Sequence, residues 1–404
     1  MAAPALTPHE RATAVAGRTM VYLETTYRGY LTYRQDGTRH REALVVHRAC
    51  SGVVVNPDGY VLTTDDCVRP DPSDLLADAL HTLAGQRRID PDQVDEFVAA
   101  TRPTAVFSGS KAGEPPSTTV YGQLGVADQG RTTAPAAPAT VVSTQSAGED
   151  ALALVKLQRS SLPAVELAAD PTPSRDAEPV VLSYRPRGGD ATSAEYAVRA
   201  GSATVTGRDP ARLRLAGDLR TEDRGGAVVD AWGRLLALLD VTPATAGGPA
   251  VAGVTAARVA DFLAAAGVPN TVSEVDLAYR DALRDYFAGR FSAAVGKLDA
   301  LLRDAPAHSW ARTYRDRARE RLAVDGDAVE NAGTWSRYLL SAVAGVLVIA
   351  AIGECRRRAW RLLRAAQLRA VAAGSGPGGE GTVGDHAVAD GDTAATTETG
   401  PPSG

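Results

Sequence analysis

The stretch Cys50-SGVVVNPDGYVLTTDD-Cys67-Val68 carries most of the information about the fold, because it joins two apolar runs through a turn signal. The runs Val53–Val55 and Tyr60–Thr64 are rich in β-branched and aromatic residues, which favour strands. Between them, Asn56-Pro57-Asp58-Gly59 has the residue types of a tight turn. We therefore predict a β-hairpin here, with one cysteine before it and one after it.

Short strand-like runs continue from about Met20 to Gly267, which favours a β-barrel or β-sandwich. Two segments interrupt them. Residues 72–100 place leucines at helical spacing and predict a helical insertion. Residues 109–138 are rich in Gly, Pro, Ser and Thr and predict a long loop.

The Cys50–Val68 stretch resembles the first barrel of the trypsin-like (chymotrypsin-fold) serine proteases. In that family a Cys-Ser-Gly strand and a hairpin precede Thr-Ala-x-His-Cys-Val. The resemblance covers about residues 20–267 and implies a mainly β fold, with two six-stranded barrels and a cleft between them.

The cysteines alone leave two alternatives: one disulfide with a free Cys355, or three buried thiols. The family resemblance implies a disulfide between Cys50 and Cys67. A loop of this size would contribute roughly 3 kcal/mol. Such a bond also favours an oxidising compartment.

The same resemblance places Asp66 where the family has its catalytic histidine. A carboxylate with a pKa near 3.9 is a poor proton acceptor at neutral pH. In TEDRGG, Arg224 stands at the nucleophilic serine and Gly225 at the glycine after it. Glu222 replaces a glycine of the oxyanion hole, and its charge would disfavour an oxyanion.

The third triad position is ambiguous, because the family strand aligns Ala151 with the acid and leaves Asp150 one residue early. Two arrangements of the substituted cleft are then conceivable. An aspartic dyad of Asp66 and Asp150 lacks an Asp-Thr-Gly loop. An ion pair between Asp66 and Arg224 is the favoured interpretation, because these side chains should face one another.

The function predicted from these residues is that of a degenerate serine protease homologue, a pseudoprotease that binds or scaffolds a protein or peptide. The alternative is an active trypsin-like endopeptidase with an unorthodox or misaligned site. No cofactor or metal site is expected, because the chain has no metal-ligand helix and no phosphate-binding loop. A net charge of −5 argues against nucleic-acid binding.

Residues 273–324 change to helical periodicity and resemble about one and a half tetratricopeptide repeats (TPR). The alternative is a generic helical hairpin. So short an array normally needs the barrel or a partner to cover its apolar face.

A membrane anchor is predicted near the C-terminus, because Tyr338 to Gly353 carries no charge. Arginines follow it, including Arg356, Arg357 and Arg358, which suit anionic lipid. By the positive-inside rule the N-terminal domain is extracytoplasmic and the C-terminal tail cytoplasmic, in a single-pass plasma-membrane protein. A buried helix in a soluble protein and a cytoplasmic, tail-anchored protein are the alternatives.

Residues 1–17 have no basic start followed by an apolar core, so no signal peptide is recognised. Either the true start lies upstream or the late apolar segment directs targeting. The predicted organisation is a flexible N-terminus (1–19), a protease-like domain (20–267), TPR-like helices (273–324), a linker (325–334), a transmembrane helix (335–354), a basic juxtamembrane helix (355–373) and a disordered tail (374–404).

Overall fold

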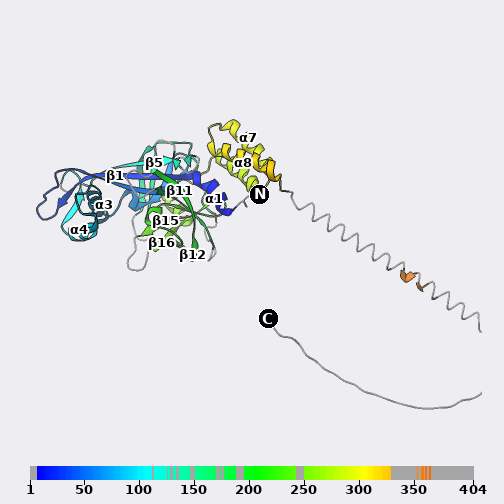
Figure 1. Ribbon diagram of the computed structural model, residues 1–404, viewed down its shortest axis with the longest axis horizontal. Coiled ribbons are helices and arrows are strands. Elements are labelled where there is room, and N and C mark those ends of the chain that lie inside the picture. Colours follow the sequence, from blue (N-terminus) through cyan, green and yellow to red (C-terminus); the bar gives the residue numbers. More distant parts are fainter. Residues whose placement is uncertain are drawn as a thin grey trace, which may run out of the picture. The chain divides into compact units, whose positions relative to one another are not determined.

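A computed structural model gives the architecture of the chain (Figure 1). It describes residues 7–111, 113–124, 126–127, 131–132, 136–145, 151–169, 173, 177–187, 195–242, 250–328 and the positions 353, 356–358, 360, 361 and 364. Met1–Ala328 form one compact unit and Val329–Gly404 a second. Except for Gly353, the predicted membrane segment lies outside the described residues. Among the helices that are described, none is both long and apolar enough to cross a bilayer.

Six antiparallel strands close into the first barrel. They are β1 (Met20–Tyr33), β2 (Leu44–Asn56), β3 (Tyr60–Thr64), β9 (Leu152–Leu157), β8 (Ala137–Gln145) and β5 (Ser117–Leu124). The barrel closes because β1 pairs with both β2 and β5. The predicted hairpin is confirmed: Val53 lies opposite Leu62, and Gly59 in the turn has φ +97°. A positive φ suits glycine, which has no Cβ to clash.

The second sheet is open, whereas a second closed barrel was expected. Its strands follow the order β12 (Thr204–Arg208), β13 (Arg212–Ala216), β16 (Ala250–Thr255), β15 (Leu235–Thr242), β14 (Ala227–Val229), β10 (Val180–Arg187), β11 (Glu195–Ser202), β7 (Arg131–Thr132) and β6 (Val126–Ala127). β11 and β12 follow one another with only Ala203 between them, and Val205 N–H of β12 donates to Ala177 O at 3.0 Å, close to the start of β10. On its other side β11 pairs with β7, with Ala197 opposite Arg131. The fold is therefore chymotrypsin-like, with one six-stranded barrel and one half-barrel sheet.

The two sheets share one apolar core. Val53 and Leu62 of the first barrel belong to the same buried cluster as Leu182 and Leu238 of the second sheet. Two helices also contribute to this cluster, α1 (Pro8–Ala16) through Ala12 and Ala16, and α5 (Ala256–Ala265) through Val259 and Phe262. A rigid core of this kind fixes the two sheets against each other. The cleft is the place where Asp66 of the first barrel and Arg224, just before β14, meet.

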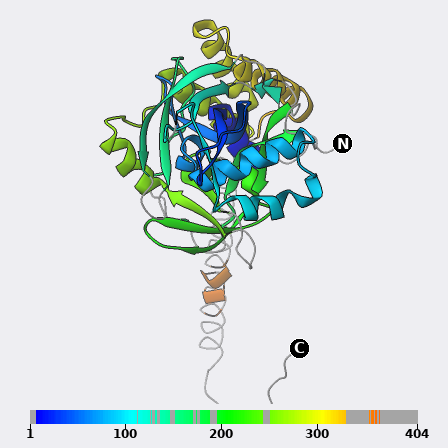
Figure 2. The same cartoon turned by 90° about the vertical axis from the view of Figure 1, so that its left-hand side faces the viewer.

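The segment 72–100 contains α3 (Pro72–Gly85), the 3₁₀ turn η2 (Pro91–Gln93) and most of α4 (Val94–Thr101). Leu76 and Leu80 of α3 pack with Tyr27 of β1 and with Phe107 of β4 (Ala105–Ser108) in a second core. Figure 2 views the compact unit from this side, with α3 and α4 in light blue at the front. The predicted loop 109–138 was wrong in part, because its β-branched run Thr118–Val120 lies in β5.

Three helices follow the second sheet: α6 (Glu274–Phe287), α7 (Phe291–Asp304) and α8 (Ser309–Asp325). Tyr286 lies at their centre, with its ring 5.6 Å from Phe291 and 5.2 Å from Tyr314. Ala14 and Val15 of α1 complete this cluster. The helices therefore pack on one another and on α1, while the TPR resemblance stays a prediction.

Candidate functional site

The disulfide implied by the family resemblance is present. Cys50 of β2 bonds to Cys67 of the short helix α2 (Asp65–Val68), and their Cα atoms are 6.1 Å apart. Both residues are buried. The bond ties α2, which carries Asp66, to the neighbouring strand. Cys355 lies outside the described residues.

Asp66 and Arg224 form the predicted ion pair across the cleft. Arg224 Nη1 lies 2.5 Å from Asp66 Oδ2, and the two side chains are 13% and 35% exposed. Asp66 also accepts a 2.7 Å hydrogen bond from Thr64 Oγ1. Both oxygens of this carboxylate are therefore engaged.

A second arginine supports Asp66 from the first barrel. Arg48 Nη1 donates to the Asp66 carbonyl at 2.8 Å, and Arg48 Nε contacts Asp78 Oδ2 of α3 at 3.1 Å. Burial raises the pKa of Asp78, and the positive charge of Arg48 opposes that rise. The helical insertion thus contributes directly to holding the side of the cleft that carries Asp66.

Arg224 is fixed through both its backbone and its side chain. Its carbonyl accepts from Ser51 N–H at 2.9 Å, and its Nη2 donates to the Val241 carbonyl at 3.2 Å. Nearby Asp240 is bound by Arg212 at 2.9 Å, and burial raises the pKa of Asp240. A guanidinium held in this way is a permanent cation with five donors and no acceptor.

The residues before Arg224 form a closed turn. Thr221–Asp223 is a 3₁₀ helix, η3, in which Arg224 N–H donates to the Thr221 carbonyl at 3.2 Å. Gly225 N–H donates to Leu239 O at 2.9 Å, and Gly225 has φ +74°. The backbone donors of Arg224 and Gly225 are therefore engaged by protein carbonyls, and the Glu222 side chain is exposed.

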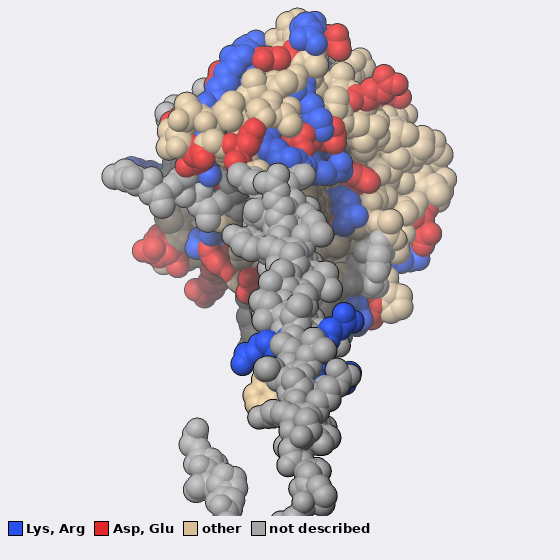
Figure 3. Space-filling model, turned by 90° about the vertical axis from the view of Figure 1, so that its right-hand side faces the viewer, with Lys and Arg blue, Asp and Glu red and all other residues tan. Residues whose placement is uncertain are grey.

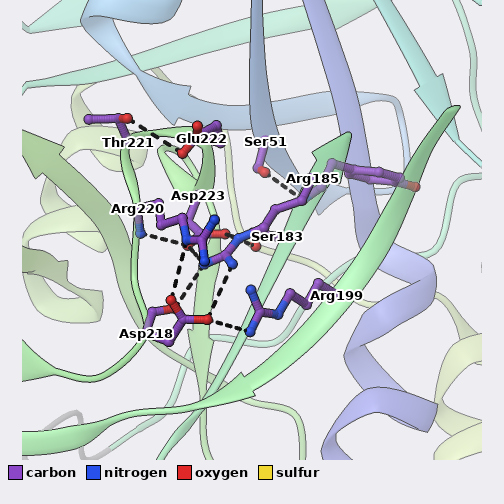
Figure 4. Close-up of polar contacts among 10 residues, drawn as sticks. Ser51, Ser183, Arg185, Arg199, Asp218, Arg220, Thr221, Glu222 and Asp223 are labelled. Atoms are coloured by element: carbon purple, nitrogen blue, oxygen red, sulfur yellow. Dashed lines mark hydrogen bonds and ion pairs between the residues drawn. The ribbon is translucent and has the colours of Figure 1, made fainter. Parts of the chain in front are cut away.

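Sequence analysis missed a buried charge cluster beside this turn (Figure 4). Asp223 is 1% exposed and accepts from Ser183 Oγ at 2.6 Å and from Arg185 Nε at 2.5 Å. Arg185 Nη2 also pairs with the second carboxylate oxygen, and Asp223 raises the pKa of Arg185. Ser183 and Arg185 are two apart in β10 and so share one face. That two-residue spacing was the sequence signal that could have predicted a shared partner for Ser183 and Arg185.

The same cluster continues to the surface through Asp218. Its carbonyl accepts from Arg185 Nη2 at 2.8 Å, and its carboxylate contacts Arg199 at 2.7 Å and Arg220 at 3.3 Å. Figure 4 shows these side chains converging below Glu222. The cluster holds η3 against β10 and β11 of the second sheet.

Residues 50–238 match the trypsin-like peptidase domain family. This segment is a trypsin-like peptidase domain. Among solved structures, the chain is similar to the HtrA-type protease AlgW with a decapeptide, at 14% identity, with 64% of this chain and 67% of that chain covered and a TM-score of 0.39. For the serine endoprotease from Yersinia pestis the identity is 15%, the coverage 64% and 66%, and the TM-score 0.37. The chain thus spans about two thirds of each structure. No curated protein sequence matches it.

Within the trypsin-like peptidase domain, the structure brings Asp66 and Arg224 together and places Glu222 and Gly225 on the adjacent turn. Asp150 lies outside the described residues, whereas Ala151 accepts from Asp65 N–H at 3.2 Å. His47 contacts Glu24 Oε1 at 2.8 Å and is largely exposed. In the described ranges, no group of His, Cys, Asp and Glu side chains could hold a metal ion.

Two buried serines of the peptidase domain lie near the cleft, but each is engaged. Ser51 Oγ accepts from Tyr184 N–H at 2.8 Å, and Ser183 Oγ donates to Asp223. Activation of a serine as a nucleophile requires a neighbouring base with a free acceptor. Asp223, which accepts from Ser183 Oγ, is also held by Arg185 Nε at 2.5 Å.

Proposed function

We propose that this trypsin-like peptidase domain is catalytically inactive and acts by binding rather than by cutting. The observation that carries this proposal is the 2.5 Å ion pair between Arg224 and Asp66, which stand where the family has its serine and histidine. A serine protease needs a nucleophile and a base that can accept and return a proton. Arginine offers no nucleophile, and a carboxylate bound by arginine is a weak base.

The turn beside Arg224 supports the same proposal. An oxyanion hole needs backbone N–H groups aimed at the developing negative charge. Here Arg224 N–H donates to Thr221 O at 3.2 Å, within η3. The exposed Glu222 adds a negative charge next to the same turn. Both features oppose stabilisation of a tetrahedral oxyanion.

The test is labelling of the purified protein with a fluorophosphonate, which reacts with activated serines. We expect no labelling of the natural protein. The double variant Asp66→His with Arg224→Ser restores the base and the nucleophile and is expected to label weakly. Arg224→Ser alone is the matched control and should stay unlabelled, because its serine lacks a base. Labelling of any serine in the natural protein would overturn the proposal.

The proposal extends to the setting of the domain. We place it outside a membrane, where it binds or scaffolds a protein or peptide, with Tyr338 to Gly353 in the bilayer and Arg356, Arg357 and Arg358 on anionic lipid. The uncharged run and the arginines after it support this arrangement. The oxidised Cys50–Cys67 pair also suits an external compartment.

Thiol labelling of intact cells tests this topology. A membrane-impermeant maleimide should leave Cys355 unlabelled until the cells are opened, because Cys355 follows the membrane segment on the cytoplasmic side. Cys50 and Cys67 should react only after reduction. Labelling of Cys355 from outside would contradict the orientation, and three free thiols would favour a cytoplasmic domain.

A further inference from the structure

A cavity of about 320 Å³ lies where α1, the turn between β14 and β15, and α6 meet. Its walls are mostly charged or aromatic: Arg11, Glu166, Trp232, Arg234, Arg280 and Arg284. The residues that line it include neither Asp66 nor Arg224, the two members of the ion pair in the cleft. The cavity is thus a different site. Ligand binding there does not depend on whether the peptidase domain cleaves peptides.

Three of its four arginines, Arg234, Arg280 and Arg284, have close carboxylate partners. Arg280 Nη1 lies 2.8 Å from Glu166 Oε2, and Arg234 Nη2 lies 2.7 Å from Asp230 Oδ2. Burial lowers the pKa of Arg280, and Glu166 opposes that change. These pairs fix the walls of the cavity.

Arg11 has no such partner. Its guanidinium lies 3.6 Å from the centre of the Trp232 ring, and its Nε donates to the Ala231 carbonyl at 2.6 Å. In the part of the chain that the structure describes, no carboxylate comes within 4.0 Å of it. Burial lowers the pKa of Arg11, because it keeps the charge partly away from water, and the more distant Asp230 carboxylate opposes only part of that cost. An anion in the cavity would recover that cost.

Arg284 is the second cation available to a ligand. It is 61% exposed, and its partner Asp281, at 3.1 Å, also binds Lys297 Nζ at 2.5 Å. Arg284 therefore shares Asp281 with Lys297, and Lys297 Nζ also binds Asp285 Oδ2 at 2.7 Å. The four arginines of the cavity thus pair with three carboxylates, Glu166, Asp230 and Asp281, which leaves an excess of positive charge.

The cavity also has an apolar surface. Val15 of α1 and Leu283 of α6 line it, and Trp232 presents a half-exposed ring. Figure 3 shows positive and negative side chains interspersed on the described part of this face that grey atoms leave uncovered. A bare inorganic ion would leave the apolar surface uncovered, and a polyanion such as nucleic acid would need a wider basic face.

We propose that this cavity binds an acidic peptide segment. A Glu or Asp carboxylate of the peptide pairs with Arg11 and Arg284, because the guanidinium fork matches a carboxylate through two parallel hydrogen bonds. An apolar neighbour in the peptide packs on Trp232, Val15 and Leu283. The site would then hold a protein partner at the junction of the barrels and the helices.

The experiment is fluorescence anisotropy of a labelled octapeptide of alternating Glu and Leu, titrated with the purified full chain. The same peptide with Gln for Glu keeps the apolar part and removes the charge. Arg11→Gln and Arg284→Gln each remove one proposed contact. Arg303→Gln, which changes an exposed arginine of α7 away from the cavity, is the matched control.

We expect the Glu peptide to bind and the Gln peptide to bind at least about tenfold more weakly, as loss of a charge-assisted hydrogen bond implies. Each cavity variant should lose a similar factor, and Arg303→Gln should bind like the natural protein. Arg284 is exposed, so its variant keeps the fold even if Arg11→Gln does not. Equal binding of both peptides, undiminished binding by Arg284→Gln, or binding of anionic vesicles in place of peptide would overturn the proposal.

Discussion

Arg18 and Asp276 form a buried ion pair, with Nη2 and Oδ1 2.5 Å apart, that joins the first barrel to the helices. Arg18 lies in the 3₁₀ turn η1 (Gly17–Thr19), directly before β1, and Asp276 lies in the first turn of α6. The second oxygen of Asp276 accepts from Ser273 Oγ at 2.9 Å and from Ala164 N–H at 3.3 Å. One carboxylate therefore connects three segments of the chain.

Replacing Arg18 with Gln should destabilise the protein strongly, because it leaves the Asp276 charge buried without its main partner. We expect a loss of about 3 kcal/mol in the free energy of unfolding, the scale for breaking one side of a buried pair. Urea unfolding followed by circular dichroism measures it. Arg18→Gln combined with Asp276→Asn removes both charges and should recover part of the loss. A loss below about 0.5 kcal/mol for the single variant, the range of an ordinary surface change, would contradict this role.

The pair in the cleft should contribute less, because Asp66 is 35% exposed. A double-mutant cycle of Asp66→Asn and Arg224→Gln should give a coupling free energy of about 1 kcal/mol, the upper end for exposed pairs. The coupling should shrink in high salt, since exposed charges are screened. The control is the same double-mutant cycle on the exposed pair Arg258 and Asp261, whose charged groups are 3.6 Å apart. Its coupling free energy should be close to zero.

The structural features that the sequence predicted correctly are formed by residues close together in the chain. The hairpin at Gly59 and the disulfide between Cys50 and Cys67 depend on neighbours fewer than twenty positions apart, and both are confirmed. The Asp66–Arg224 pair was predictable because the family resemblance places both residues in one cleft.

The structural features that the sequence did not predict depend on contacts between residues far apart in the chain, and the sequence around each residue indicates its partner only weakly. Asp223 binds Arg185, 38 positions earlier, and the only local signal is the two-residue spacing of Ser183 and Arg185, which many strands share. Strand β7 lies in a Gly- and Thr-rich stretch that predicted a loop, yet it pairs with β11 of the second sheet. Asp150 and the membrane segment before Gly353 lie outside the described residues, so those expectations stay predictions.

Removal of the disulfide should destabilise the first barrel. The bond links residues 17 apart, and the chain-entropy relation gives about 3 kcal/mol for a loop of that size. The variant with Cys50→Ala and Cys67→Ala should therefore unfold at lower urea concentration than the natural protein. Cys355→Ala, which leaves the bond intact, is the matched control and should unfold like the natural protein. An unchanged midpoint for the double variant would show that the bond contributes nothing to stability.

His308 should make the stability of the helical region depend on pH. Its Nδ1 accepts from Ala311 N–H at 2.9 Å, and its Nε2 faces Arg18 Nη1 at 2.7 Å. Burial, together with the charge of Arg18, lowers the pKa of His308 from 6.5 to about 4. Between these two values the unfolded chain binds a proton and the folded protein does not. The free energy of unfolding therefore falls as the pH decreases from 6.5 towards 4, by up to about 3 kcal/mol.

The variant His308→Asn separates this effect from the titration of the carboxylates. Asn keeps a side-chain acceptor at the N-cap of α8, a position that Asn suits, and it does not titrate. Urea unfolding at pH 7.5 and at pH 4.5 should show a larger loss for the natural protein than for His308→Asn. The difference between the two losses measures the proton linkage of His308 alone. Equal losses would mean that the His308 ring takes up a proton as readily in the folded protein as in the unfolded chain.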